Sequence, residues 1–267
     1  MKDYPERRSS VIIHRMEKNS GQAEVRKWGI QNASGEYIIH CDSDDWVDKD
    51  LYLSMYEKAV TDKVDVVVCD YRLTNGTSII NEVKGCGSTE KESFIQRLLL
   101  QRDPWSLCNK LFSRRVCYKD LVYPEGNMGE DMLLCIQMVC RCTKIGYVPD
   151  NYYYYYCNEN SISNLRDISL HIRNYEQLKL NTDIMIELLN TIFISHKTWI
   201  VNSLQYNATI TLLNVIHNSS VYRDLWMNTY PGSNIRFLIN PFAKLSDRIK
   251  CLLALIGLYP FKKDRLS

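Results

Sequence analysis

The fold of this 267-residue chain is decided by one stretch, Tyr37-Ile38-Ile39-His40-Cys41-Asp42-Ser43-Asp44-Asp45-Trp46. Its first five residues form an apolar run of the length expected of a buried β-strand. The acidic residues that follow repel one another and favour a bound cation. Oxygen ligands at this density suit Mg²⁺ or Mn²⁺, and Mg²⁺ commonly binds together with substrate phosphates. We therefore expect a metal and diphosphate site at this strand end, where open α/β sheets place their ligands.

Helices and strands alternate around this stretch, which indicates an α/β fold. We expect strands at residues 10–14, 36–41, 64–69, 145–148 and 152–156, and helices at residues 22–33, 50–60, 91–101 and 130–142. Residues 74–88 are polar and predict a loop or hairpin. In the first helix Val25, Trp28 and Ile30 are available to pack inward, and in the second Leu51, Met55 and Ala59 recur on one face.

The character of the chain changes near residue 164, after which no strand is predicted and residues 165 to about 217 favour helices. We expect a domain at 1–163 and a helical region at 164–267. Residues 241–267 contain six Lys or Arg against two Asp, interspersed with apolar residues. Two interpretations of this basic amphipathic tail remain open, namely contact with a membrane surface and packing on the rest of the protein.

Composition excludes several classes of protein. The net charge of +2 gives no signal for nucleic-acid binding, so no nucleic-acid partner is expected. The ten cysteines are scattered without a Cys-x-x-Cys pair, which favours reduced thiols in a cytoplasmic protein. The polar N-terminus is unlike a secretion signal, and no apolar run reaches the ~18 residues that a membrane span needs.

Three further segments contain candidate functional residues, and each also has a purely structural interpretation. Gly129-Glu130-Asp131 opens a helix, and Asp131 is either a helix-capping carboxylate or a general base that takes a proton from a hydroxyl. Trp105–Phe112 reads as a core segment with one solvated lysine. Tyr152–Ser163 begins with five tyrosines, which read as an edge strand with half-buried rings.

Several motifs in one order identify a protein family more specifically than any single motif does. The motifs are an arginine-containing helix (Gly21–Ile30), Ala-x-Gly-Glu-Tyr-Ile (Ala33–Ile38), Asp-Ser-Asp-Asp-Trp (Asp42–Trp46), Asn-Lys-Leu-Phe (Asn109–Phe112), Gly-Glu-Asp (Gly129–Asp131) and a tyrosine run leading to Asn-Ser-Ile-Ser (Tyr154–Ser163). Over residues 10 to 163 the chain resembles the family 2 glycosyltransferases of bacterial capsule, exopolysaccharide and lipopolysaccharide assembly. The resemblance implies a GT-A fold, a Rossmann-like mixed sheet, with a helical C-terminal appendage.

The resemblance also implies a donor site for a nucleotide-sugar. Asp42 and Asp44 match the family's metal and diphosphate motif, with Asp44 as the more direct ligand of Mn²⁺ or Mg²⁺. Asp45 is expected beside the donor sugar. Arg26 matches an arginine near the donor phosphates, although Val25 and Lys27 replace the family's alanine and asparagine on either side of it.

The resemblance further implies inversion at the anomeric carbon, with Asp131 as general base and Glu130 as its neighbour. The expected acceptor is a glycan or a lipid-linked glycan at the cytoplasmic face of the inner membrane. The family's opening strands, which hold the nucleotide, are expected to be missing, because the chain starts at the family's third strand. An alternative is therefore an inactive remnant that serves as a binding or assembly subunit. A third reading, a Mg²⁺-dependent phosphohydrolase with Asp42 as nucleophile, gives no role to Glu130, Asp131 or the tyrosine run.

Overall fold

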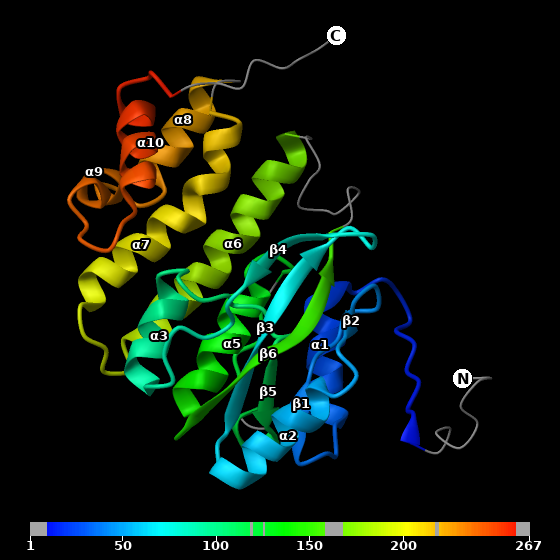
Figure 1. Ribbon diagram of the computed structural model, residues 1–267. Helices are drawn as coiled ribbons and strands as arrows, with labels where there is room; N and C mark the ends of the chain where they lie inside the picture. Colours follow the sequence, from blue (N-terminus) through cyan, green and yellow to red (C-terminus); the bar gives the residue numbers. More distant parts are fainter. Residues whose placement is uncertain (1–9, 118–119, 125, 158–167, 217–218, 260–267) are drawn as a thin grey trace.

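The computed structural model describes residues 10–117, 120–124, 126–157, 168–216 and 219–259. Within these ranges a mixed β-sheet is covered by helices, and the last helices gather at one end of the molecule (Figure 1). The strands are β1 (Tyr37–Ile39), β2 (Trp46–Val47), β3 (Val66–Thr74), β4 (Ile79–Val83), β5 (Lys110–Ser113) and β6 (Ile145–Tyr156). The helices are α1 (Gly21–Asn32), α2 (Leu51–Asp62), α3 (Lys91–Leu99), α4 (Arg114–Cys117), α5 (Glu130–Arg141), α6 (Ile168–Leu189), α7 (Lys197–Thr209), the 3₁₀ helix η3 (Ile210–Asn214), α8 (Ser220–Asn228), α9 (Ser233–Leu238) and α10 (Leu245–Leu255).

Strand β3 is the centre of the sheet, whose order is β1-β5-β3-β6-β2. It pairs parallel with β6 and antiparallel with β5 and, further along, with β4. The first four residues of β3, Val66–Cys69, are fully buried, as the β-branched run predicts. Strands β1 and β2 pair antiparallel with β5 and β6, so the predicted mixed α/β sheet and the hairpin at residues 74–88 are confirmed.

The two faces of the sheet carry separate apolar clusters. Helix α2 covers one face with Leu51, Met55 and Ala59, all fully buried as their spacing predicts. Helices α3 and α5 cover the other face, where Leu98 and Leu133 lie in the larger cluster. The sheet therefore lies between helix α2 on one face and helices α3 and α5 on the other. The loops at the strand ends remain available to form a site.

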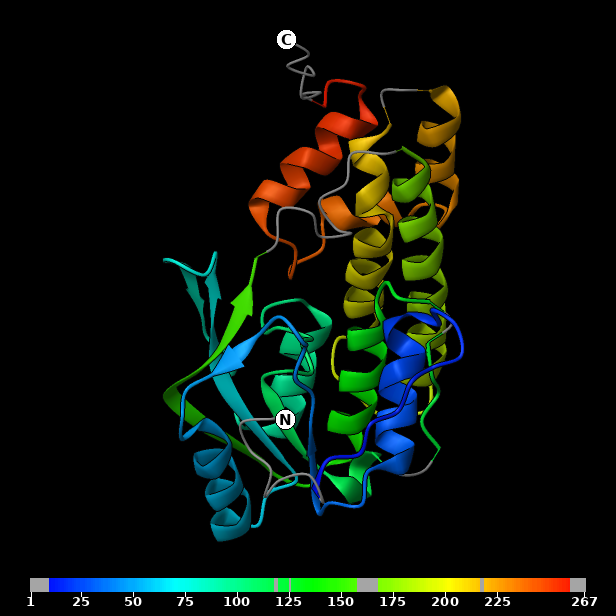
Figure 2. The same ribbon diagram turned by 90° about the vertical axis from the view of Figure 1, so that its right-hand side faces the viewer.

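Helices α6 and α7 lie side by side and run from the sheet toward the group formed by α8, α9 and α10 (Figure 2). Met185 and Ile200 from these two helices belong to the same apolar cluster as α3 and α5. The proposed boundary near residue 164 lies outside the described residues, so the division into 1–163 and 164–267 stays a prediction.

Three local predictions are wrong. Residues 11–16 form no strand, and Ile12 and Ile13 are exposed. Val25 is 53% exposed on α1, where Ala23, Arg26 and Ile30 form the buried face instead. Residues 145–156 form one continuous strand, because the register shift between Cys69 and Asp70 of β3 accommodates Pro149-Asp150 without ending the pairing.

The final part of the tyrosine motif, residues 158–163, lies outside the described residues. The same holds for residues 260–267 of the basic tail. Within the described ranges, no helix combines the length and apolarity needed to cross a bilayer.

Candidate active site

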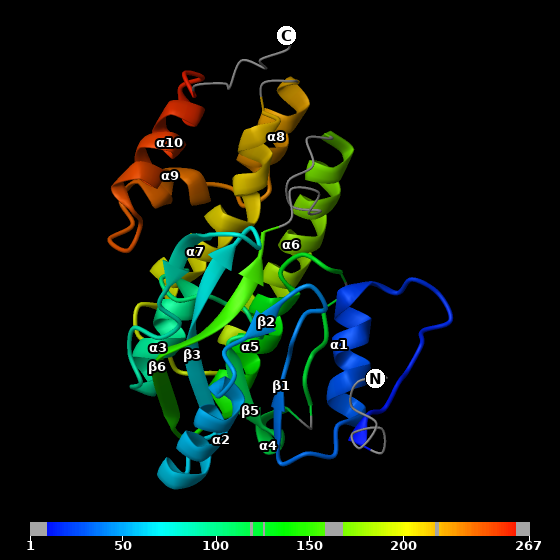
Figure 3. The same ribbon diagram turned by 45° about the vertical axis from the view of Figure 1, so that its right-hand side comes forward.

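Arg26 joins three carboxylates that are far apart in the sequence. It lies on the buried face of α1 and its side chain is only 7% exposed. Its Nη1 donates to Glu130 Oε1 at 3.0 Å and to Asp131 Oδ1, while Nη2 lies 3.5 Å from Asp42 Oδ1. Figure 3 shows how α1 and α5 stand on the same side of the sheet beside β1. The acidic turn after β1 and the first turn of α5 thus meet at one guanidinium.

Local backbone geometry places Glu130 and Asp131 at the start of α5. Gly129 precedes them with φ of 82°, a conformation that favours glycine, and a Cβ there would lie 2.9 Å from Leu178 Cδ1. The first turn of a helix favours negative charge, so both carboxylates suit this position. The Glu130 side chain is buried, whereas that of Asp131 is 31% exposed and within reach of a ligand.

Helix α6 holds the loop that leads into α5. Gln177 Oε1 accepts from the backbone N–H groups of Asn127 and Met128 at 3.1 and 3.3 Å. Asn181 Nδ2 donates to the Met128 carbonyl at 2.8 Å. In the same loop Asn127 Oδ1 accepts from the Ala23 N–H of α1 at 3.3 Å. One loop therefore fixes both the helix that carries Arg26 and the helix that carries Asp131.

The acidic turn is anchored by Tyr153 of β6. The Tyr153 hydroxyl donates to Asp45 Oδ2 at 2.5 Å and accepts from the Asp42 N–H at 3.1 Å. Asp45 Oδ1 accepts from the Tyr156 N–H at 2.8 Å. Asp44 is exposed at the tip of the turn and has no hydrogen-bond or ionic partner among the described residues. The turn thus uses Asp45 to hold its shape and presents Asp44 to ligands.

Burial and charge shift the protonation equilibria of this cluster. Burial, followed by the negative charge of Asp131, raises the pKa of Glu130 to about 7. Burial also raises the pKa of Asp131, against the opposing effect of Arg26. Burial alone would lower the pKa of Arg26, yet its carboxylate neighbours raise it. Burial and the adjacent Arg26 lower the pKa of His40 to about 4, so this imidazole is neutral at pH 7.

Lys110 differs from its expected solvated state, because it is fully buried. Its Nζ donates to the carbonyls of Pro104 and Ser106 at 2.8 Å and to Asn109 Oδ1 at 2.9 Å. These three acceptors match the three N–H groups of an ammonium, which satisfies its hydrogen bonds away from water. The Asn-Lys pair therefore ties the loop before β5 into the core behind the acidic cluster.

The acidic turn offers two carboxylates to a divalent cation. Among the described residues, no three His, Cys, Asp or Glu side chains gather as a metal-binding group. Asp45 is engaged by Tyr153 and Tyr156, which leaves Asp44 and part of Asp42. Two such carboxylates fit an ion whose remaining ligands are water and substrate phosphates, which is the usual environment of Mg²⁺.

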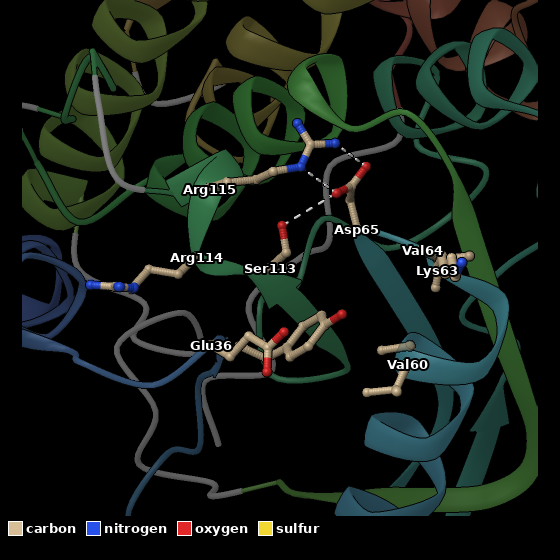
Figure 4. A pocket seen from close by; sticks show the side chains of 10 residues that line it. Glu36, Val60, Lys63, Val64, Asp65, Ser113, Arg114 and Arg115 are labelled. Carbon is tan, nitrogen blue, oxygen red and sulfur yellow. Dashed lines mark hydrogen bonds and ion pairs between the residues drawn. The ribbon is translucent and has the colours of Figure 1, made fainter.

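A cavity of about 480 Å³ lies at the opposite end of β1, near Glu36, and has a different character (Figure 4). Its Asp65 is satisfied by protein donors: Arg115 Nε and Nη2 at 2.7 and 2.5 Å, and the Thr143 N–H and hydroxyl at 2.6 and 2.7 Å. Despite burial, these donors lower the pKa of Asp65. The carboxylate therefore joins β3 to α4 and to the start of β6.

The structure brings Arg26, Asp42, Glu130 and Asp131 into one cluster, with Asp44 and Asp45 on the adjoining turn; the roles of these six residues stay predictions. Sequence reasoning missed Tyr153, although the alternation of side chains along a strand assigns alternate tyrosines to the same side. It also missed Gln177, whose contact with the Asn127 loop no sequence pattern signals.

Comparisons with known proteins find similarity to glycosyltransferases. Residues 1–120 match the model of glycosyl transferase family 2. Glycosyltransferase GlyA of Streptococcus pneumoniae is 24% identical over 163 residues, which cover 57% of this chain and 23% of GlyA. The cholesterol galactosyltransferase of Borreliella burgdorferi is 24% identical over 62% of this chain and 49% of its own length. Uncharacterized glycosyltransferase YibD of Escherichia coli is 24% identical over 80% of this chain and 63% of its own length. The chain thus spans less than two thirds of each of these relatives.

Solved structures share the fold. Staphylococcus aureus TarS superposes with a TM-score of 0.60 and 15% identity, over 97% of this chain and 46% of TarS. A shorter TarS, residues 1–349 in complex with UDP-GlcNAc, superposes with a TM-score of 0.58 and 18% sequence identity. The superposition covers 97% of this chain and 68% of that TarS chain. The chain therefore resembles the family 2 glycosyltransferases over residues 1–120 and shares the mixed-sheet fold of TarS.

Proposed function

We propose that this chain transfers a sugar from a nucleotide-sugar donor to an acceptor hydroxyl in cell-surface polysaccharide assembly, with inversion at the anomeric carbon. The observation that carries the proposal is the Arg26 cluster, which joins Asp42 of the acidic turn to Asp131 of α5. The match of residues 1–120 to the glycosyl transferase family 2 model supports it, as do structural relatives solved with UDP-GlcNAc and with UDP.

In this proposal Asp131 takes the proton of the acceptor hydroxyl as that oxygen attacks the anomeric carbon. The Asp131 side chain is 31% exposed, which gives an acceptor access. The protein atoms around it exclude part of its hydration and so raise its pKa, which strengthens it as a base. Glu130 lies behind it, against Arg26, and keeps that guanidinium oriented. The displaced group is a nucleoside diphosphate, so the transferred sugar changes its anomeric configuration in a single step.

The donor side of the site is formed by the acidic turn and Arg26. Asp44 and Asp42 would hold Mn²⁺ or Mg²⁺, which when bound neutralises charge on the departing diphosphate. Arg26 contributes a fixed positive charge beside that position. Asp45 keeps the turn in shape next to the donor sugar through Tyr153.

The proposed acceptor is a glycan, or a glycan on a lipid carrier, at the cytoplasmic face of the inner membrane. The chain would then be a cytoplasmic protein with peripheral membrane contact. This location follows from the kind of assembly in which the family's enzymes take part, and the site geometry is compatible with any acceptor that offers a hydroxyl to Asp131.

The test is a panel of nucleotide-sugars with Mg²⁺ or Mn²⁺, assayed with purified Asp131→Asn and Asp44→Ala variants. Removing the base is expected to reduce the transfer rate by ~10²–10⁴ with the fold intact. Asp44→Ala is expected to abolish metal-dependent transfer from the donor while the protein stays folded. Asp62→Asn, in the exposed pair with Lys58 at the end of α2, is the matched control. Wild-type transfer by both site variants would contradict the mechanism, and donor binding without any turnover would favour the inactive binding subunit.

A further inference from the structure

Helix α10 is apolar on two opposite faces. One face is buried through Cys251 and Ala254, which are 0% and 2% exposed. At about 100° per residue the four exposed apolar residues of the helix and its C-terminal end fall within an arc of about 60° on the far side. These residues remain 72%, 49%, 46% and 57% exposed, and we call them the α10 stripe: Leu245, Ile249, Leu252 and Ile256.

The α10 stripe is exposed although the helix itself is firmly seated. Cys251 and Ala254 belong to an apolar cluster that includes Trp226 of α8 and Phe237 of α9. The Tyr206 hydroxyl of α7 donates to the Asp247 carbonyl at 3.3 Å. Helices α8, α9 and α10 form one group at the end of the molecule (Figure 1). The buried face therefore fixes the direction in which the stripe points, away from the protein.

Positive charge surrounds the stripe. Residues 235–258 contain four cations and one anion, a net charge of +3 in a chain whose total is +2. Lys244 just before α10, Lys250 on α10 and Arg236 on α9 are exposed, and Lys250 Nζ lies 3.6 Å from Asp247 Oδ1. Two more apolar side chains, Ile235 on α9 and Ile239 just after it, are 62% and 70% exposed. The region thus combines a net positive charge with several exposed apolar side chains.

We propose that the α10 stripe docks on an anionic lipid bilayer, with its apolar side chains entering the interface and the surrounding cations facing lipid headgroups. A helix with an exposed apolar face flanked by Lys and Arg has the composition of interfacial helices. A second copy is a poorer fit, because a two-fold contact through this stripe would bring two patches of charge +3 together. The proposal does not depend on sugar transfer, so an inactive chain would still bind.

The experiment is flotation of the full chain with vesicles of neutral phosphatidylcholine, alone or with anionic phosphatidylglycerol. The wild type should float with the anionic vesicles and do so less at high salt. Leu245→Ser with Ile249→Ser should reduce partitioning by roughly tenfold or more, because two exposed apolar side chains leave the interface. Lys244→Gln with Lys250→Gln should reduce it by about fivefold per cation.

The matched control is Leu53→Ser with Val60→Ser, which removes two comparably exposed apolar residues from α2 at 57% and 47%. Its partitioning should equal that of the wild type, and thermal melts should show that all variants are folded. The proposal is overturned if the wild type does not float, or if the stripe and control variants float equally. It is also overturned if light scattering shows a dimer that the stripe variant converts to monomer, since the occupant would then be a second copy.

Discussion

Replacing Glu130 with glutamine should stabilise the protein at alkaline pH and leave it unchanged at acid pH. Glu130 is buried, and its pKa rises from 4.5 to about 7 because of burial and then of Asp131. A carboxyl whose pKa is higher in the folded state binds its proton more tightly there than in the unfolded chain. Stability therefore falls as pH rises from about 4.5 to 7, and the full cost of ionisation is present above pH 7.

The size of the effect follows from the shift. One pKa unit corresponds to about 1.36 kcal/mol, so the rise to about 7 amounts to roughly 3 kcal/mol at pH 8. Glu130→Gln keeps an oxygen that can accept from Arg26 Nη1, which lies 3.0 Å from Glu130 Oε1, and never ionises. The variant should match the wild type near pH 4.5 and exceed it by up to roughly 3 kcal/mol at pH 8.

Urea unfolding measured at several pH values between 4.5 and 8 checks this prediction. Glu24→Gln on α1, where the glutamate is 48% exposed, is the control and should change stability by no more than about 0.5 kcal/mol at any pH. If Glu130→Gln followed the wild-type curve across the whole range, the ionisation of Glu130 would carry no folding cost, and the electrostatic account of the cluster would be refuted.

Three further substitutions test the frame of the site. Tyr153→Phe removes the hydroxyl that joins Asp45 to the turn; a loss of about 1–3 kcal/mol in urea unfolding and weaker donor binding by calorimetry are expected. Gln177→Leu leaves two loop N–H groups without their acceptor, so transfer should fall by up to ~10²-fold through displacement of Asp131, with a smaller change in KM. Gly129→Ala forces a side chain into φ of 82° and should lower stability by about 1–3 kcal/mol.

Each of these has a result that would count against it. Unchanged donor affinity in the tyrosine variant would mean that the turn keeps its shape without the hydroxyl. A Gln177 variant with full activity would show that α6 does not position the catalytic loop. A melting temperature equal to that of the wild type in the Gly129 variant would show that the loop relaxes without cost.

The sequence predicted the elements whose signals are local. The β-branched run at residues 64–69 and the four-residue spacing of α2 gave the correct strand and helix, because burial of one face imposes that pattern. The order of the motifs also predicted that Asp42 and Asp131 share a site, which the common ion pairs of Arg26 agree with. The segment at residues 10–14 failed because apolar composition alone does not supply a neighbouring strand to pair with.

Contacts that depend on the folded chain could not be predicted from sequence patterns. The burial of Lys110 is one case: its three acceptors lie within six residues of it, but they surround its ammonium only because the loop before β5 folds back around it. The continuity of β6 across Pro149 depends on the register shift in β3. Gln177 contacts a loop some fifty residues earlier in the chain, as the separation of the hydrogen-bonded residues shows.

The helical region from α6 to α10 is attached to the proposed catalytic site by direct contacts. Its α6 holds the loop that sets Asp131, and Ser195, just before α7, donates its hydroxyl to Glu92 of α3 at 2.6 Å. Farther along, Asn240 Nδ2 donates to the Trp199 carbonyl of α7 at 2.9 Å and so ties the segment before α10 to the same helix. Because each step is a direct packing or hydrogen-bond contact, a bilayer bound at the α10 stripe would fix the orientation of the Asp131 site relative to the lipid surface. The bound protein would then meet a lipid-linked acceptor by diffusion along the membrane surface instead of by diffusion through solution.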